Sequence, residues 1–232
     1  MTPPPLPDEA VQAQIDKISI DHHHPLIICD ADEVLLQFIV GLEDYLECQG
    51  LWLDLTSYAI TGNIKQRDTG EPVSDDDVKT LLEDFFATQT EHIKAMPGAA
   101  VALQRLTQQN AQIVVLSNLP STQRAARQRC LQAQGMDYPV ITNQGLKGAA
   151  VAYLSRAMRA PVFFLDDLYH HLTDAFKWRE DLYYVHFIAD SRLAGFAKKA
   201  LKNDTSTTKI VFQETNWPDT YNKISKLLDK NL

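Results

Sequence analysis

Two aspartates, Asp30 and Asp32, stand where a short apolar run from Leu26 to Cys29 ends. Such a run is typical of a buried β-strand. In an open α/β sheet, ligands bind in the crevice outside the carboxyl ends of the strands, so both carboxylates are expected at the mouth of a pocket. Paired carboxylates there can act as a nucleophile and an acid–base group, or can hold a divalent cation.

Further polar residues occupy similar positions later in the chain. A hydroxyl at the end of a second predicted strand can donate a hydrogen bond into the crevice that receives Asp30. A lysine opens a predicted helix, and a pair of acids follows another apolar run. These residues are Ser117, with Asn118 beside it as a candidate substrate-binding residue, Lys147, Asp166 and Asp167.

The rest of the sequence predicts the elements that hold these side chains. Short apolar runs rich in β-branched and aromatic residues are typical of buried strands, and segments with helical spacing and capping signals alternate with them. This alternation predicts an α/β fold with a mostly parallel sheet and helices on both faces. The predicted strands are 26–29, 113–116, 138–141, 162–165, 184–188 and, more weakly, 209–212, and the predicted helices are 99–109, 122–134 and 147–158.

The interval 42–96 breaks this alternation. Ser74, followed by Asp77, gives a capping signal for a helix with apolar residues at helical spacing. Connections of this length usually carry function or structure of their own. We therefore predict a small, mainly helical cap at 42–96, inserted into a core domain of 21–41 and 97–232, with residues 1–20 as a flexible N-terminal arm.

Composition narrows the class of protein. The chain has 232 residues, of which 45% are hydrophobic, and a formal net charge of -8, which disfavours nucleic acid as a partner because no surplus of Lys and Arg can displace counterions from phosphates. Three widely spaced cysteines indicate neither a disulfide framework nor a zinc site. No segment reaches the roughly 20 apolar residues needed to span a bilayer, and the N-terminus lacks signal-peptide features. We expect a cytoplasmic protein without membrane contact; the oligomeric state is left open.

In their order along the chain, the candidate residues resemble the motifs of the haloacid dehalogenase-like (HAD) superfamily. Those motifs are DxDx(T/V), a Ser or Thr after the second strand, a distant Lys, and a DD or GDxxxD pair. The resemblance covers about residues 25–190 and includes the position of the predicted cap. One departure is Gly148 after the lysine, where many members have a Pro-containing KPxP run. The motifs correspond here to Asp30-Ala31-Asp32-Glu33-Val34, Ser117, Lys147 and Asp166-Asp167.

The resemblance implies a Rossmannoid core and a phosphatase mechanism. It implies that Asp30 attacks phosphorus to form an aspartyl-phosphate, while Asp32 protonates the leaving oxygen and later activates water. Ser117 and Lys147 would hold the phosphoryl oxygens. The implied Mg²⁺ ligands are Asp30, the backbone carbonyl of Asp32, and Asp166 and Asp167, of which Asp167 is favoured as the direct ligand.

Electrostatics supports a metal if the substrate is a phosphate. A carboxylate about 4 Å from a phosphoryl anion costs on the order of 4 kcal/mol at an effective dielectric near 20. One lysine cannot cancel several such repulsions. A hard divalent cation with oxygen ligands can, so Mg²⁺ is the expected cofactor.

Asp32 narrows the reaction within the superfamily. Dehalogenases of the superfamily lack an acid two positions after the nucleophile, and its transport ATPases carry Thr there, whereas phosphatases and phosphomutases carry Asp. We expect a phosphohydrolase acting on a small phosphorylated metabolite. A phosphomutase, and a catalytically silent HAD-fold binding or regulatory protein, are the alternatives.

The cap is expected to select the substrate. Lys65 and Arg67 are its candidate substrate-binding residues because either could meet a second phosphate or carboxylate, although such residues more often solvate a loop. Of the adjacent His170 and His171, only one can face the site from a helix. The arginines of the predicted helix 122–134 are expected to form a solvated face.

Overall fold

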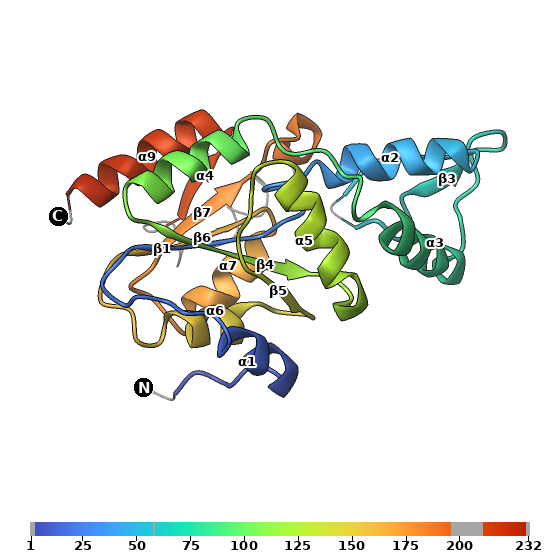
Figure 1. Cartoon of the computed structure of the whole chain (residues 1–232). Helices are drawn as coiled ribbons and strands as arrows, with labels where there is room; N and C mark the ends of the chain where they lie inside the picture. The colour runs from blue at the N-terminus through green and yellow to red at the C-terminus, as the bar shows by residue number, and fades with distance from the viewer. Residues whose placement is uncertain (1–2, 58, 196–210, 231–232) are drawn as a thin grey trace.

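The computed structural model of the protein describes residues 3–57, 59–195 and 211–230 (Figure 1). Its core is a six-stranded sheet in which all neighbours are parallel. The chain proceeds from the central strand to one side of the sheet and then returns to the other side, which creates a topological switch point beside that strand. In sheet order the strands are β5 (Val140–Asn143), β4 (Gln112–Asn118), β1 (Leu26–Cys29), β6 (Val162–Asp166), β7 (Tyr183–Phe187) and β8 (Val211–Glu214).

The predicted α/β class and mostly parallel sheet are confirmed. Each apolar run forms a strand because both faces of the sheet are covered, so a continuous run can be buried. β4 extends beyond its predicted end to Asn118. The weak sixth run forms β8 over Val211–Glu214, whereas residues 209 and 210 of that prediction lie outside the described residues.

The two faces of the sheet bury alternate residues of each strand. In β1, Ile27 and Cys29 pack into one hydrophobic cluster and Leu26 and Ile28 into another. Figure 1 shows the helices of the two layers on opposite sides of the sheet. The first layer contains α4 (Ala99–Gln108), α5 (Arg124–Ala133), which follows a short 3₁₀ turn, and α9 (Trp217–Asp229); the second contains α1 (Glu9–Ile15), α6 (Gly148–Ser155) and α7 (Tyr169–Phe176).

The N-terminal segment differs from the predicted flexible arm. α1 buries Val11 and Ile15, which are one helical turn apart and pack into the second hydrophobic cluster. The Gln14 side chain accepts a hydrogen bond from the Thr142 backbone N–H at 2.9 Å and donates one to the Thr142 carbonyl at 3.2 Å. This segment is therefore part of the core, because a single amphipathic turn is enough to attach it to the edge strand.

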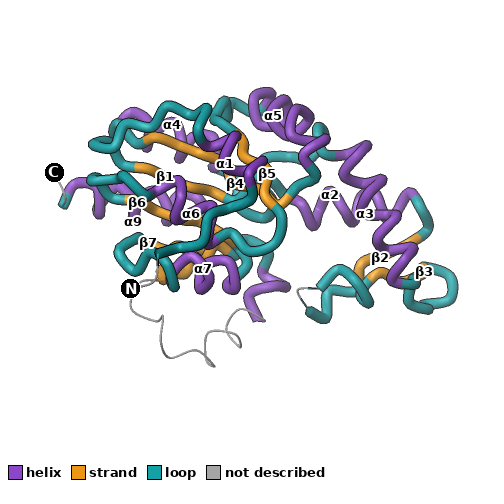
Figure 2. Tube along the Cα trace, turned by 90° about the horizontal axis from the view of Figure 1, so that it is seen from below, coloured by secondary structure: helices purple, strands orange, loops and turns teal. Residues whose placement is uncertain are grey.

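The cap lies to one side of the core (Figure 2). It contains α2 (Phe38–Cys48), a two-stranded antiparallel sheet of β2 (Leu51–Leu53) and β3 (Ile64–Gln66), and α3 (Asp75–Gln89). α2 begins four residues before the predicted boundary at 42. The predicted capping signal of α3 forms, since the Ser74 hydroxyl accepts a hydrogen bond from the Asp77 N–H at 3.2 Å.

Among the described residues, no helix combines the length and the apolar character needed to cross a membrane.

Candidate active site

Three neighbouring strands end at the same edge of the sheet and bring the predicted residues together. Asp30 directly follows β1, and its N–H donates to the Leu165 carbonyl at 2.9 Å. Ser117 and Asn118 end β4, and Asp166 ends β6. Because β4 and β6 flank β1, these residues all lie at the same edge of the sheet, beside the switch point.

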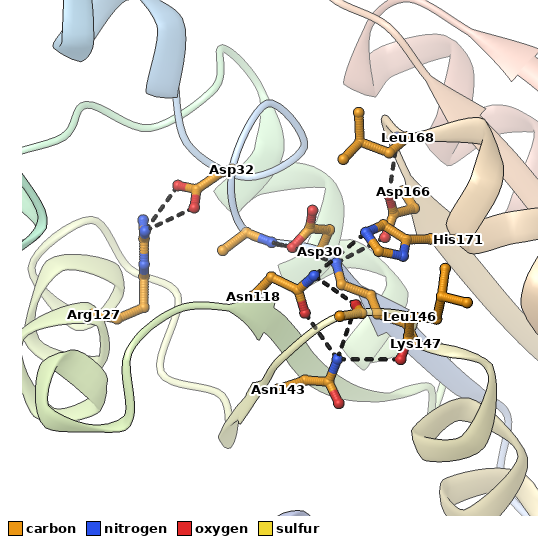
Figure 3. Close-up of polar contacts among 12 residues, drawn as sticks. Asp30, Asp32, Asn118, Arg127, Asn143, Leu146, Lys147, Asp166, Leu168 and His171 are labelled. Carbon is orange, nitrogen blue, oxygen red and sulfur yellow. Dashed lines mark hydrogen bonds and ion pairs between the residues drawn. The ribbon is translucent and has the colours of Figure 1, made fainter. Parts of the chain in front are cut away.

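Lys147 is the cation of this edge. Its Nζ lies 2.8 Å from Asp30 Oδ1 and 2.8 Å from Asp166 Oδ2 (Figure 3), and its side chain is 0% exposed. Burial alone disfavours an ammonium, but the Asp166 and Asp30 carboxylates outweigh it and raise the pKa of Lys147 above its usual range. The lysine therefore stays charged and fixes the orientation of both carboxylates.

Gly148, which departs from the KPxP pattern, holds Lys147 in place. Its N–H donates to Asp174 Oδ2 of α7 at 2.9 Å, and proline has no N–H to do so. A Cβ at this position would collide with the Asp174 side chain and lie 2.8 Å from its carbonyl oxygen. The glycine is therefore required by its close packing against Asp174. Lys147 still lies at the start of α6, despite the difference from the KPxP pattern.

A cluster of three buried acids offers a cation site. Asp30, Asp166 and Asp167 each present a carboxylate oxygen within 4.8 Å of the others. Burial raises the pKa of Asp30 to about 6, although Lys147 opposes this shift. Burial, together with repulsion from Asp166 and Asp30, raises the pKa of Asp167 well above its usual range. The cluster therefore holds more acids than the single Lys147 can neutralise, and its oxygen donors suit a hard divalent cation.

The two adjacent acids differ in their partners. Asp166 Oδ2 contacts Lys147, and its Oδ1 accepts from the Leu168 N–H at 2.9 Å, at the start of α7. The Asp167 carboxyl has no hydrogen bond or ion pair within the described part of the chain, and it lines the pocket described below. His186 Nε2 donates to the Asp167 carbonyl at 2.8 Å and holds this segment. Asp167 thus keeps its carboxylate available for a ligand.

Asp32 points to a different partner. Its Oδ1 and Oδ2 lie 2.8 and 3.0 Å from Nη2 of Arg127, and Figure 3 shows this pair apart from the cluster around Asp30. Burial raises the pKa of Asp32, although Arg127 opposes the shift. Arg127 itself is fully buried on α5. The expectation of a solvated arginine face is therefore wrong for Arg127, because the helix turns this residue toward the sheet edge.

Ser117 and Asn118 lie at the end of β4 and differ in their hydrogen bonding. The Ser117 hydroxyl is fully buried and has no hydrogen-bond partner among the described residues. A buried hydroxyl without a partner costs about 1–3 kcal/mol, which a ligand oxygen at this place would offset. The Asn118 amide accepts from Asn143 Nδ2 and donates to the Gly145 carbonyl, both at 2.8 Å.

Asn118 also lines a pocket of about 200 Å³ between the core and the cap. The core contributes acids and polar residues to this pocket, and the cap contributes apolar ones. A larger pocket of about 630 Å³ lies elsewhere, at residues 23–25 and 158–162, and contains none of the acidic cluster; we therefore place the candidate site in the smaller pocket. Its lining residues are Asp30, Asp32, Glu33, Phe38, Ile39, Leu55, Ile60, Phe86, Asn118, Asp167, Leu168, His171 and Leu193.

The cap cations Lys65 and Arg67 are not among these lining residues. Lys65 Nζ lies 2.6 Å from Asp54 Oδ2, and Arg67 Nη2 lies 3.4 Å from Glu47 Oε1. The structure thus separates both side chains from the acidic cluster. Their contact with substrate stays a prediction.

Glu33 and His171 complete the polar lining and were not among the main sequence candidates. Glu33 has a φ of 57°, in the left-handed region, and its Oε1 accepts from the Ile39 N–H of α2 at 2.7 Å. His171 is buried, whereas its neighbour His170 is exposed. Burial and the nearby Lys147 lower the pKa of His171 to about 3, so this ring is neutral. The adjacent histidines were a signal, but only the packing of α7 decides which one faces the pocket.

Comparison with solved structures identifies the fold. No family model and no curated protein matches the sequence. A predicted phosphatase from Clostridium acetobutylicum has a TM-score of 0.57 at 13% identity, covering 88% of this chain and 99% of its own. A putative beta-phosphoglucomutase from Thermotoga maritima has a TM-score of 0.56 at 14% identity, covering 88% and 100%.

A HAD family hydrolase from Deinococcus radiodurans R1, solved with bound phosphate and sodium, has a TM-score of 0.55 at 14% identity, covering 91% of this chain and 97% of its own. At such identities the similarity shows the fold. The chain therefore has the HAD-like fold that the order of its motifs predicts.

Proposed function

We propose that this protein is an Mg²⁺-dependent phosphohydrolase that acts on a small phosphorylated metabolite through an aspartyl-phosphate on Asp30. The observation that carries the proposal is the cluster of Asp30, Asp166 and Asp167 around the buried Lys147. Three buried carboxylates and one ammonium fit a divalent cation together with a phosphoryl group. They do not fit a purely structural role, because the Asp167 carboxyl is left without a partner among the described residues.

Asp30 is suited to be the nucleophile. Its Oδ1 accepts from the Ala31 N–H at 2.7 Å and contacts Lys147, so the carboxyl is held at the pocket floor. A carboxylate oxygen attacks phosphorus, and the bond from phosphorus to the leaving oxygen breaks. Lys147 and the Ser117 hydroxyl would bind the phosphoryl oxygens and stabilise their charge.

Asp32 would carry the proton in both halves of the reaction. In its protonated form it gives a proton to the leaving oxygen, and as a carboxylate it then takes one from the water that releases phosphate from Asp30. Asp32 lines the pocket, but its carboxyl faces Arg127. The proposal therefore requires this side chain to turn from Arg127 toward the substrate.

The metal would be held by Asp30, Asp166, Asp167 and the Asp32 carbonyl. When bound, Mg²⁺ would neutralise charge on the phosphoryl group.

The test is phosphate release from a panel of phosphoesters, with and without Mg²⁺. We expect Asp30→Asn to lose about 10⁴-fold or more in rate because the nucleophile is removed. Ser117→Ala removes a single donor and should lose about 10² to 10³-fold. The exposed cap residue Asp68 supplies a matched control, since Asp68→Asn removes a carboxylate that is not at the pocket.

Metal-dependent release that is equal in wild type and Asp30→Asn would contradict the proposal. Absence of release from every ester would favour a silent binding protein. Transfer of the phosphoryl group between positions of one sugar, with little free phosphate, would identify a phosphomutase instead.

A further inference from the structure

We propose that the substrate is a phosphate monoester whose leaving group is compact, mainly apolar and free of a second anionic group. The inference rests on the proposed function, because that function places the phosphoryl end at Asp30 and hence the leaving group against the cap. What the leaving group meets can then be determined from the lining of the pocket.

The cap presents only apolar side chains to the pocket among the residues described there. Phe38 and Ile39 come from α2, Leu55 and Ile60 from the connection between β2 and β3, and Phe86 from α3. The rings of Phe38 and Phe86 are stacked, with centroids 5.9 Å apart and planes at 25°. An apolar leaving group buried against these residues would be stabilised by the removal of its surface from water.

A second anionic group would find no counter-charge in the pocket. None of the described lining residues is Lys or Arg, and Lys147 already contacts two carboxylates. The cap cations Lys65 and Arg67 instead contact Asp54 and Glu47. A second phosphate or a carboxylate would therefore lose its hydration in the pocket without gaining a counter-charge. Burying an unpaired charge in this way is costly.

Glu33 adds a further acid to the lining of the pocket. It is 6% exposed and precedes α2, and its carboxyl accepts from the Ile39 N–H at the start of that helix. It lines the same pocket as the apolar cap residues. An anionic leaving group would therefore gain no opposite charge from this residue, which an uncharged leaving group does not need.

Polyols fit the pocket poorly as well. Burying a hydroxyl without a hydrogen-bond partner is unfavourable, and the neutral polar lining residues, Asn118 and His171, belong to the core. The pocket volume of about 200 Å³ is below the roughly 300–1,000 Å³ of typical ligand pockets. Both facts favour a small apolar alcohol over a sugar.

The experiment compares kcat/KM for three alkyl esters: benzyl phosphate, glucose 6-phosphate and 2-phosphoglycolate. Benzyl phosphate has an ordinary alkoxide leaving group, so its rate does not reflect an unusually acidic alcohol. Acetyl phosphate serves as the reference for the proposed function. We expect benzyl phosphate to exceed each of the other two alkyl esters by at least about 10²-fold.

A variant pair tests the cap wall. Phe86→Ala should lower the ratio of benzyl phosphate to acetyl phosphate turnover about tenfold or more. Leu82→Ala is the matched control, because Leu82 lies one turn earlier on α3, is half-buried and does not line the pocket. In Leu82→Ala, the ratio of benzyl phosphate to acetyl phosphate turnover should stay within about twofold of the wild-type ratio.

Binding to the wild-type protein gives a readout that depends on neither turnover nor a variant. In the presence of Mg²⁺, calorimetry should find benzylphosphonate bound at least about tenfold more tightly than phosphonoacetate. Equal or tighter binding of phosphonoacetate, or preferred hydrolysis of 2-phosphoglycolate or glucose 6-phosphate, would overturn this inference while the proposed function stands. Failure to release phosphate even from acetyl phosphate would overturn both.

Discussion

The sheet edge of the core and the hairpin of the cap each contain a lysine in close contact with acid, but the two lysines have different surroundings. Lys147 lies 2.8 Å from both Asp30 and Asp166, and its side chain is 0% exposed. Lys65 lies 2.6 Å from Asp54, with side chains 30% and 29% exposed. Contact distance alone therefore does not separate a site from a surface pair, whereas burial does.

The difference has an energetic basis. A buried ion pair contributes little net stability, but removing one partner leaves an uncompensated charge away from water and costs about 3–5 kcal/mol. A partly exposed pair contributes about 0–1 kcal/mol because solvent screens it. The core edge is thus a place where charges depend on each other, and the hairpin is one where they do not.

The largest expected effect compares Lys147→Met with Lys65→Met. The first should reduce the free energy of unfolding by about 3 kcal/mol or more, since Asp30 and Asp166 lose their cation. The second should reduce it by less than about 1 kcal/mol. Urea unfolding followed by circular dichroism measures both. Similar losses in the two variants would show that burial does not distinguish the pairs.

Added Mg²⁺ should increase the stability of the protein by a smaller amount, through binding at the core edge. At about 100 times its Kd, a ligand that binds only the folded state adds about 2.7 kcal/mol, so Tm should rise with Mg²⁺ and return after chelation. Asp167→Asn should remove most of this rise because it replaces the unpaired carboxylate of the cluster. Asp68→Asn in the cap should keep it. An equal rise in both variants would mean that Mg²⁺ binds elsewhere.

The core edge was largely predictable from the sequence because its signals are local. Each strand that delivers a site residue is a continuous apolar run, and Asp30, Ser117 and Asp166 come at the strand ends. Parallel strands bring such ends to one edge whatever the details of packing. Position relative to a strand therefore determined which residues meet.

The remaining features depend on contacts between distant segments. Arg127 approaches Asp32 across 95 positions of the chain, and no local pattern distinguishes it from the half-buried Arg124 or from Arg129, which is paired at the surface with Glu91. The packing of Gly148 against Asp174 also joins separate segments, 26 positions apart. In the cap, the capping residues predicted α3. Lys65 and Arg67 were predicted to bind substrate because composition does not show which side of a hairpin faces the core.

Glu33 lies where the two regions meet and gives the smallest expected effect. Burial raises its pKa from the ordinary 4.5 to about 7, with Asp190 and Asp32 adding repulsion, although the Ile39 N–H opposes the shift. Between these values the folded protein binds more protons at this site than the unfolded chain does. The contribution of Glu33 to stability therefore falls as pH rises from about 4.5 to 7 and is constant above.

Glu33→Gln removes the charge but keeps an oxygen that can accept from the Ile39 N–H. The variant should match wild type near pH 4.5 and become more stable by about 2 kcal/mol at pH 8, because the pKa shift corresponds to at most about 3 kcal/mol. Urea unfolding at several pH values measures the difference, in which the titration of other groups cancels. The exposed Glu71 provides the control, since Glu71→Gln should show no such trend. A difference that does not grow with pH would place Glu33 with the solvent-screened charges of the cap rather than with the buried charges of the core edge.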